Sequence, residues 1–321
     1  MKIHYPRRHF AKLLGLTDTL LTDADKLAEL KRLGGGPDSY QPRHLSAYRR
    51  VLGCYPGREP LRRQLFLNFK GGTGKTSLSV AYAYRLAELG HRVLLIDLDS
   101  QGHATQHLGL AGENLERTVF DVMVGGVPIE DVIVGTVLAE FDVLPANLRM
   151  TTLDIGLMPM AGREYKLQRA LARVSDRYDY IVMDAPPSFG LLNLNALIAA
   201  DDLLVPVLPD FLSFHGLKLL FETLGQLEDD LNHRLQRILI VINQYNPTTR
   251  IAREAKAALE THYREFLSDV VVRQCTQFAQ ASSEGLPVNA FAPSCKGAKD
   301  IDALIGQLIS ARFERAMEKS A

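Results

Sequence analysis

The chain has 321 residues, of which 46% are hydrophobic and 23% are charged, and this ordinary composition excludes a disordered, fibrous or coiled-coil protein. Lys and Arg balance Asp and Glu at 37 each, but residues 1–64 hold 13 basic and 6 acidic side chains, which leaves the remainder net acidic. A basic segment on an acidic body suggests nucleic acid or an acidic protein as a partner.

The three cysteines are far apart and form no CxxC pair, which fits a reducing compartment and excludes a zinc or iron–sulfur site of that type. The first ten residues lack the apolar run of a signal peptide. No uncharged stretch reaches the ~20 apolar residues that cross a bilayer. We therefore expect a cytoplasmic protein.

The first 60 residues are expected to form a small helical domain. Helical patterns cover residues 8–14, 25–33 and 44–52. Three glycines and a proline at 34–37 predict a loop, and turn residues at 55–60 follow the last pattern. We therefore place the domain boundary near residue 60 and expect domains at residues 1–60 and 61–321.

From residue 64 onward, short apolar runs alternate with helical patterns. This order predicts an α/β domain with a mostly parallel, doubly wound sheet that helices cover on both faces. The expected strands are 65–69, 93–96, 141–144, 180–183, 203–207 and 238–242. The clearest expected helices are 167–174, 217–227 and 251–263. The carboxyl ends of parallel strands share one edge of the sheet, where ligands bind.

A glycine-rich loop joins the first of these strands to a helix. It consists of Lys70, Gly71, Gly72, Thr73, Gly74, Lys75 and Thr76, with Ser77 next. The glycines let backbone N–H groups converge on phosphate oxygens, Lys75 adds a full positive charge, and the Thr76 hydroxyl can bind Mg²⁺. Phe69 stands where the generic phosphate-loop pattern has a glycine, and a second lysine, Lys70, opens the loop. The strand–loop–helix context predicts a nucleoside triphosphate site.

Acidic residues follow two of the other expected strands. Asp97 and Asp99 come after the strand at 93–96, and Asp184 comes after the strand at 180–183. A nucleoside triphosphatase needs one acid to hold Mg²⁺ and another to orient the attacking water. We expect these acids to lie at the same edge of the sheet as the loop.

Three segments carry a family resemblance. In this order, KGGTGKT, VLLIDLDSQGHAT and YDYIVMDAPPSFGLLNLNAL resemble the ParA family of deviant-Walker P-loop ATPases, the partition and positioning ATPases related to MinD. The resemblance covers roughly residues 64–308. It implies an enzyme that hydrolyses ATP with Mg²⁺, forms a homodimer around ATP, and separates after hydrolysis that a partner accelerates.

The resemblance also implies roles for single residues. Lys75 would bind the β- and γ-phosphates, and Lys70 would reach the nucleotide of a second subunit. Asn243 resembles the asparagine that reads adenine in related enzymes. Residues 186–190 match the switch that senses the γ-phosphate.

The metal and the attacking water are assigned in the same way. Thr76 and Asp184, the family's Walker B acid, would bind Mg²⁺, and Asp97 would support the metal shell. Asp99 matches the acid that positions the water. Because no general base is evident, catalysis would rest on positioning and on charge stabilisation.

The DNA-binding branch of this family has a late segment that helps to form its DNA surface. Residues 272–288 match its Ser-x-Gly-x-Pro frame, but Gln274 and Gln277 stand where the family has arginines. We therefore take other basic residues as candidate DNA contacts. They are Arg250, Arg273, Lys296, Lys299, Arg43, Arg49 and Arg50.

The N-terminal residues leave two interpretations open. Residues 10–17 resemble the opening of a MerR-like helix-turn-helix, and residues 40–50 resemble the second half-motif of plasmid-type ParA proteins. Residues 1–60 are then either a DNA-reading domain or an element for dimerisation or partner docking.

At the other end of the chain, residues 301–317 follow helical spacing, with Phe313 and Met317 on the apolar side. The polar side mixes acidic and basic residues, which favours packing against the core over membrane binding.

The sequence predicts a nucleoid-associated ATPase that segregates DNA or positions a large cargo. We expect non-specific DNA and a ParB-like or other adaptor protein as partners, and no membrane. The alternatives are a MinD-like membrane-associated positioning ATPase and a DNA-binding repressor that nucleotide modulates.

Overall fold

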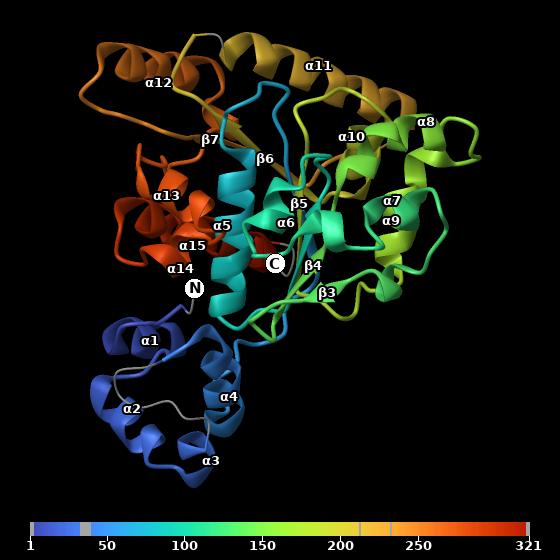
Figure 1. Ribbon diagram of the computed structural model, residues 1–321. Helices are drawn as coiled ribbons and strands as arrows, with labels where there is room; N and C mark the ends of the chain where they lie inside the picture. Colours follow the sequence, from blue (N-terminus) through green and yellow to red (C-terminus); the bar gives the residue numbers. More distant parts are fainter. Residues whose placement is uncertain (1–2, 33–39, 212, 232, 319–321) are drawn as a thin grey trace.

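A central sheet with helices on both faces organises the molecule (Figure 1). The computed structural model describes residues 3–32, 40–211, 213–231 and 233–318. Within these residues the sheet has seven strands in the order β3-β4-β2-β5-β1-β6-β7, and every neighbouring pair is parallel except β3 with β4. The strands are β1 Arg62–Phe66, β2 Val93–Asp97, β3 Val134–Gly135, β4 Phe141–Leu144, β5 Tyr180–Asp184, β6 Asp202–Val207 and β7 Arg237–Ile242. The predicted fold is confirmed.

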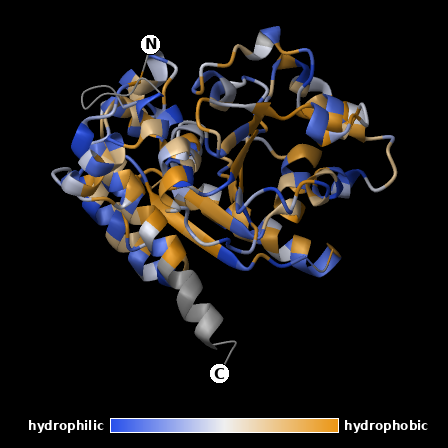
Figure 2. Cartoon of the chain, turned by 90° about the horizontal axis from the view of Figure 1, so that it is seen from below, coloured by the Kyte–Doolittle hydropathy of each residue, from blue (hydrophilic) through white to orange (hydrophobic). Residues whose placement is uncertain are grey.

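Side chains of each strand alternate between two hydrophobic cores. In and just after β1, Leu65 and Leu67 belong to one core and Phe66 to the other, and in β2 Leu94 and Leu95 divide in the same way. The strands accordingly form an apolar centre in Figure 2. Both faces of the sheet are therefore buried, as a doubly wound parallel sheet requires.

The helices divide between these two cores. Those that pack with Phe66 are α5 Lys75–Glu88, α6 His103–Gln106, α13 Gln277–Ser283, α14 Val288–Phe291 and α15 Lys296–Glu318. Those that pack with Leu65 are α7 Val119–Met123, α8 Leu153–Leu157, α9 Lys166–Ala172, α10 Leu191–Ala199, α11 Ser213–Leu231 and α12 Arg250–His262. The 3-10 helices are η1 Gly112–Asn114, η2 Ile129–Asp131, η3 Leu148–Thr152, η4 Arg163–Tyr165 and η5 Arg264–Phe266.

The first strand begins earlier than its apolar run. Arg62 pairs with Asp202, and Arg63 donates to the carboxylate of Asp201 through its backbone and side chain at 2.8 and 2.7 Å. These carboxylates neutralise the two arginines, so polar residues occupy the start of the strand. The expected strand at 65–69 was therefore placed about three residues too late.

The N-terminal unit, whose described residues form a bundle of four short helices, lies at the lower left of Figure 1. Its core stacks the rings of Phe10 and Tyr40 at 4.3 Å, with Tyr48 edge-on to Phe10. The helices are α1 Arg7–Leu14, α2 Asp18–Asp25, α3 Ala28–Lys31 and α4 Pro42–Leu52. Over its described part, the single helix expected at 25–33 is wrong: the Thr17 side chain caps a helix that starts at Asp18 and ends at Asp25, and α3 is a separate helix. The loop expected at 34–37 lies outside the described residues.

Buried polar contacts fix the N-terminal unit to the end of α5. Arg49 is 1% exposed and donates to the backbone oxygens of Leu13, at 2.9 Å, and of Glu88. The Tyr5 hydroxyl contacts both Tyr84, at 3.0 Å, and the Glu88 carboxylate. Because its guanidinium is enclosed in this way, Arg49 cannot reach DNA, and its predicted role as a DNA contact is wrong.

The C-terminal helix packs into the same core. Ile301, Leu304, Ile305 and Leu308 of α15 are buried, as the core-packing interpretation predicted. The side chains of Phe313 and Met317 lie outside the described part of the chain. Among the described residues, no helix is long and apolar enough to span a bilayer.

His9 should make the docking of the N-terminal unit sensitive to acid. Its ring packs edge-on against Tyr5, and burial and the Arg85 guanidinium lower the pKa of His9 from 6.5 to about 4. The unfolded chain therefore binds this proton more readily, so stability should fall as the pH drops from 6.5 towards 4. We expect His9→Phe to remove on the order of 1 kcal/mol of that loss.

Urea unfolding at pH 7, 5.5 and 4.5 measures this difference. His4→Phe, at an exposed position, is the control and should keep the wild-type slope. Parallel pH profiles for the wild type and His9→Phe would contradict the prediction.

Candidate nucleotide site

The glycine-rich loop leads directly into α5. Gly74 has a φ of 86°, and a Cβ at this position would collide with the side-chain amide of Asn243. That amide donates to the backbone oxygen of Thr73 at 2.8 Å. Asn243, at the end of β7, therefore braces the phosphate loop from across the sheet. Its adenine-reading role stays a prediction.

Lys75 places a buried ammonium group beneath the loop. Its side chain donates to the backbone oxygen of Lys70 at 3.3 Å, and the residue is 6% exposed. Burial lowers the pKa of Lys75, while the charges of Asp184 and Asp99 act against that shift. The ammonium thus lies within electrostatic reach of the acidic residues, as the sequence predicted.

Asp97 and Asp184 end neighbouring parallel strands and lie opposite each other in register. Both are fully buried. The Asp97 carboxylate accepts hydrogen bonds from the Asp99 backbone at 3.1 Å and from the Thr105 backbone and hydroxyl at 2.8 and 2.7 Å. Burial raises the pKa of Asp97 to about 6. Through these contacts, Asp97 can orient the backbone of Asp99 and the hydroxyl of Thr105.

Asp184 differs from Asp97 in the hydrogen bonding of its carboxylate oxygens. Neither carboxylate oxygen accepts a hydrogen bond within the described residues. Burial and the charge of Asp97 raise the pKa of Asp184 to about 8, although the hydroxyls of Thr76 and Ser79 and the ammonium of Lys75 lie near enough to oppose the rise. A buried carboxylate without a partner is a strong candidate for a cation ligand.

The surroundings of Asp184 fit Mg²⁺ bound together with phosphates. In the described part of the chain, no three His, Cys, Asp or Glu side chains gather closely enough to hold a metal. Mg²⁺ takes only one or two protein ligands and completes its shell with water and phosphate oxygens. The Thr73 hydroxyl in the loop is also buried and has no hydrogen-bond partner within the described part of the chain. Asp184, Thr76 and the loop therefore have the groups that an Mg²⁺–phosphate site requires.

Asp99 lies in the turn that follows β2, at the solvent side of the same edge. Its backbone N–H donates to Asp97, and its Oδ1 accepts from the Gln101 backbone at 3.0 Å. Being half-buried and fixed by the turn, the carboxylate is accessible to a water molecule. Its role in positioning that water stays a prediction.

Two asparagines that the sequence analysis passed over hold the loops in place. Asn68 accepts from the Lys70 backbone at 2.9 Å and donates to the Pro206 oxygen at 2.7 Å. Asn193, in α10, donates to the oxygens of Pro186 and Ser188 in the switch segment. An asparagine within the apolar sequence of α10 is the signal that could have identified Asn193. Asn68 makes contacts that no local pattern reveals.

The remaining candidate DNA contacts do not form one surface. Arg250 pairs with Glu254 at 2.6 Å, and Arg273 pairs with Asp300 at 2.6 Å. Lys296 and Lys299 in α15 are exposed and carry no ion pair among the described residues, and Arg43 and Arg50 are exposed on α4. Figure 1 places α4 in the N-terminal unit, far from α12 at the opposite end of the molecule.

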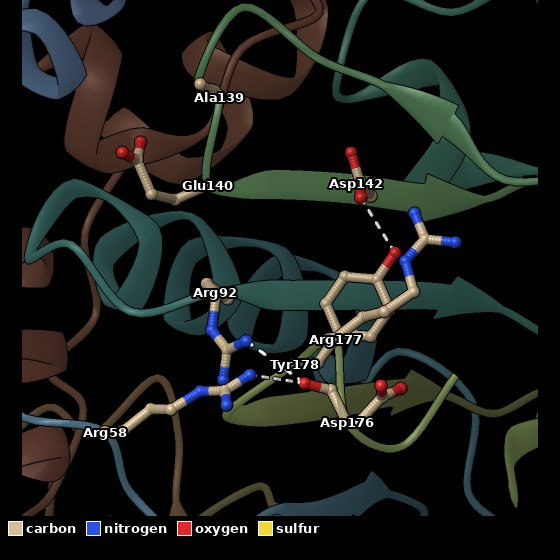
Figure 3. A pocket seen from close by; sticks show the side chains of 8 residues that line it. All are labelled: Arg58, Arg92, Ala139, Glu140, Asp142, Asp176, Arg177 and Tyr178. Carbon is tan, nitrogen blue, oxygen red and sulfur yellow. Dashed lines mark hydrogen bonds between the residues drawn. The ribbon is translucent and has the colours of Figure 1, made fainter. Parts of the chain in front are cut away.

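A cavity of about 440 Å³ lies at the other edge of the sheet (Figure 3). Its charged groups are largely paired, since Arg92 bonds Asp179 at 2.6 Å and the Tyr178 hydroxyl donates to Asp142 at 2.8 Å. The lining residues are Arg58, Arg92, Ala139, Glu140, Asp142, Asp176, Arg177 and Tyr178. They precede β1, β2, β4 and β5 or stand at the start of β4, so this cavity is not the phosphate site.

The chain is similar to proteins of known family. A family model described as an AAA domain matches residues 64–237. The chain is 55% identical to the cell division protein PomZ of Myxococcus xanthus over 305 residues, which are 95% of this chain and 92% of PomZ. It is 33% identical to the chromosome partitioning protein ParA of Caulobacter vibrioides over 258 residues, 80% of this chain and 97% of that protein.

Among solved structures, cobyrinic acid a,c-diamide synthase from Mycobacterium smegmatis, with a bound ATP analogue and magnesium, has a similar fold. The TM-score is 0.64 at 32% identity, over 70% of this chain and 92% of that one.

Asp184→Asn tests the metal site. Because the amide is neutral, it should weaken Mg²⁺-dependent nucleotide hydrolysis roughly 100-fold or more while leaving the fold intact. A Mg²⁺ titration of the hydrolysis rate measures this, with Asp131→Asn, an exposed aspartate in η2, as the control. Equal Mg²⁺ dependence in Asp184→Asn and wild type would rule out Asp184 as the metal ligand.

Proposed function

This chain belongs to the ParA/MinD-type family of partition and positioning ATPases, and from that premise we propose that it dimerises around ATP and binds nucleoid DNA without sequence preference. In this state it positions a large cargo through a ParB-like or other adaptor protein. One observation supports the proposal most. Lys75, Asp99 and Asp184, whose carboxylate accepts no hydrogen bond within the described residues, lie close together at one edge of the sheet.

The enzyme hydrolyses ATP with Mg²⁺. A solved structure that is 32% identical to this chain contains an ATP analogue and magnesium. The metal, when bound, neutralises charge on the β- and γ-phosphates. On the protein side, Lys75 adds a second positive charge, and the backbone N–H groups of the loop surround the phosphates. Asp99 orients water towards the γ-phosphate. Because catalysis rests on positioning and charge stabilisation, basal turnover is slow, which leaves room for a partner to accelerate it.

Exposed apolar side chains beside the switch support dimerisation. Phe189 is 67% exposed although it packs edge-on against Phe69, which precedes the loop. Leu148, Ile155 and Met158, in or next to η3 and α8, are also more than half exposed. Asp154 joins α8 to the start of α10 by accepting from the Leu192 backbone at 2.9 Å. Apolar groups gathered near a nucleotide-sensing segment are suited to burial against a second subunit.

The comparison with PomZ bears on the cargo. An alignment that covers 95% of the chain includes most of the N-terminal unit, whereas the Caulobacter ParA alignment covers 80%. A relative that shares both parts and is named a cell division protein supports a cargo connected with cell division over a plasmid.

The N-terminal unit is poorly suited to reading an operator. If the motif that opens at residues 10–17 is a helix-turn-helix, it reads DNA with its second helix, α2, which carries Asp18, Asp23 and Asp25 without any Lys or Arg. Arg7 is held by Asp25 at 3.1 Å. The charge of α2 would repel phosphate, which argues against the repressor alternative.

Lys75→Ala and Asp99→Ala should separate binding from hydrolysis. Without its ammonium, Lys75→Ala should not bind ATP tightly and should stay monomeric. Asp99→Ala should bind ATP and remain a dimer, because the water is no longer positioned, with turnover lowered roughly 100-fold. Light scattering after gel filtration, with and without ATP, measures this. Identical elution of Asp99→Ala in both conditions would contradict the proposal.

Lys296 and Lys299 should contribute to ATP-dependent DNA binding. Replacing both by Ala should weaken binding to DNA of any sequence and lower the slope of log affinity against log salt by about 2, one for each lost phosphate contact. Fluorescence anisotropy across a salt series, with a non-hydrolysable ATP analogue, gives the slope.

The double variant Arg43→Ala/Arg50→Ala removes the same charge from α4 and should keep the wild-type slope. A lower slope in this variant alone would place the DNA contact on the N-terminal unit and favour the repressor alternative.

A further inference from the structure

The turn that carries Asp99 is built onto helix α6. The backbone N–H of Gly102, which precedes α6, donates to the Asp99 backbone oxygen at 2.9 Å, and the Gln101 N–H donates to Asp99 Oδ1 at 3.0 Å. From within α6, the Gln106 side chain donates to the Gln101 backbone oxygen at 3.2 Å. A displacement of α6 would therefore also displace the carboxylate of Asp99.

The far end of α6 is in contact with α13. His107, which directly follows α6, has its Nε2 2.5 Å from the hydroxyl oxygen of Ser282 in α13, although the two residues are 175 positions apart in the sequence. The backbone of Gly285 also lies against this end of α6, because a Cβ at Gly285 would be only 3.3 Å from the Gln106 oxygen. A side-chain hydrogen bond and a close backbone approach thus join the two helices.

The imidazole of His107 is suited to a lasting contact with a hydroxyl. Burial, together with the charge of His103, lowers the pKa of His107, so the ring is neutral at pH 7. A neutral imidazole has one donor and one acceptor nitrogen, and a serine hydroxyl can take either complementary role. Both His107 and Ser282 are half-buried. Their hydrogen bond can therefore form whichever nitrogen carries the proton.

Helix α13 can support α6 because it is itself packed into the core. Ala281, which precedes Ser282, is buried in the same core as Ala104 of α6. The ring of Phe278 lies so close to Gly297 of α15 that a Cβ there would be 2.6 Å from a ring atom. In contrast, α6 has only four residues, and so short a helix is not stable without tertiary contacts. Its position should accordingly depend on α13.

We propose that His107 and Ser282 are positioning residues for ATP hydrolysis, whose hydrogen bond keeps Asp99 where it orients the attacking water. This inference rests on the proposed role of Asp99. Without the bond, the turn would also sample positions in which the water is not aligned. The phosphate loop and Asp184 belong to other elements, so the binding of ATP and Mg²⁺ should not change. The net contribution of one neutral hydrogen bond corresponds to a loss in kcat of roughly 2- to 10-fold.

Ser282→Ala tests the contact because it removes the hydroxyl alone. With Mg²⁺ and ATP, kcat should fall roughly 2- to 10-fold while KM stays unchanged. Ser282→Thr keeps the hydroxyl and should restore the wild-type kcat. Ser175→Ala is the matched control, since Ser175 is exposed and its hydroxyl donates to the backbone oxygen of Ala172 within the preceding turn. An unchanged kcat in Ser282→Ala, or a loss that lies entirely in KM, overturns the inference.

A double-mutant cycle shows whether the two residues act through one bond. His107→Phe keeps a ring and removes both nitrogens, so kcat should fall about as much as in Ser282→Ala. The variant that combines both changes should lose no more than the more affected single variant. His107→Gln keeps a polar group and should lie closer to wild type than His107→Phe. Losses that multiply in the combined variant overturn the inference.

Hydrogen exchange of the ADP-bound chain examines the turn without hydrolysis. The amides of Gln101 and Gly102, which donate to Asp99, should exchange roughly 2- to 10-fold faster in Ser282→Ala than in wild type, as measured by mass spectrometry of the peptide. ADP binding shows whether each variant is folded. Unchanged exchange in a folded Ser282→Ala overturns the inference. If that variant does not fold, His107→Phe decides by the same two measurements.

Failure of the proposed role of Asp99 would look different. An Asp99→Ala variant with the wild-type kcat would overturn that role, and with it any effect of the contact on hydrolysis. The exchange rates of the Gln101 and Gly102 amides would still show whether His107 and Ser282 hold the turn.

Discussion

Two carboxylates, Asp97 and Asp184, end adjacent parallel strands in register and are fully buried, and one buried ammonium, Lys75, lies within reach of the charge of Asp184. The parallel sheet imposes this proximity, because it brings the ends of β2 and β5 to the same edge. Like charges in contact are unfavourable in a medium of low dielectric constant. Among the described residues, the chain relieves the conflict for Asp97 with three hydrogen bonds and leaves Asp184 with none. The Mg²⁺ of a bound Mg²⁺–nucleotide complex would supply the positive charge that the Asp184 carboxylate still lacks.

Polar side chains from distant strands keep this arrangement in place. Asn243 braces the loop from β7, and Asn68 ties the start of the loop to the end of β6. Asp210, which follows β6, holds the ammonium of Lys70. The loop is thus connected to three places along the sheet edge before any ligand binds. Such preorganisation lowers the cost of gathering donors around a highly charged phosphate group.

Much of this could be predicted from the sequence, for reasons that are local. The loop, the strand-ending acids and the alternation of strands and helices depend on residue types at short spacing. The start of β1 was missed because Arg62 and Arg63 are neutralised by Asp202 and Asp201, some 140 residues away. The burial of Arg49 was missed for the same reason, since its acceptors come from two other helices. Contacts between segments far apart in the sequence leave no periodic signal.

Helix α5 connects the N-terminal unit to the nucleotide site. The loop precedes Lys75 at one end of α5, and Arg85 and Glu88 at the other end join the contacts to Tyr5 and Arg49. Both termini of α5 are therefore engaged by polar groups, and its sides are buried in the core that the N-terminal unit shares with the ATPase. A module that reads DNA independently would be expected to sit on a flexible linker with its basic residues outward. Here the most enclosed arginine faces inward and α2 is acidic, so the unit is better understood as part of the ATPase body that any movement of α5 must carry along.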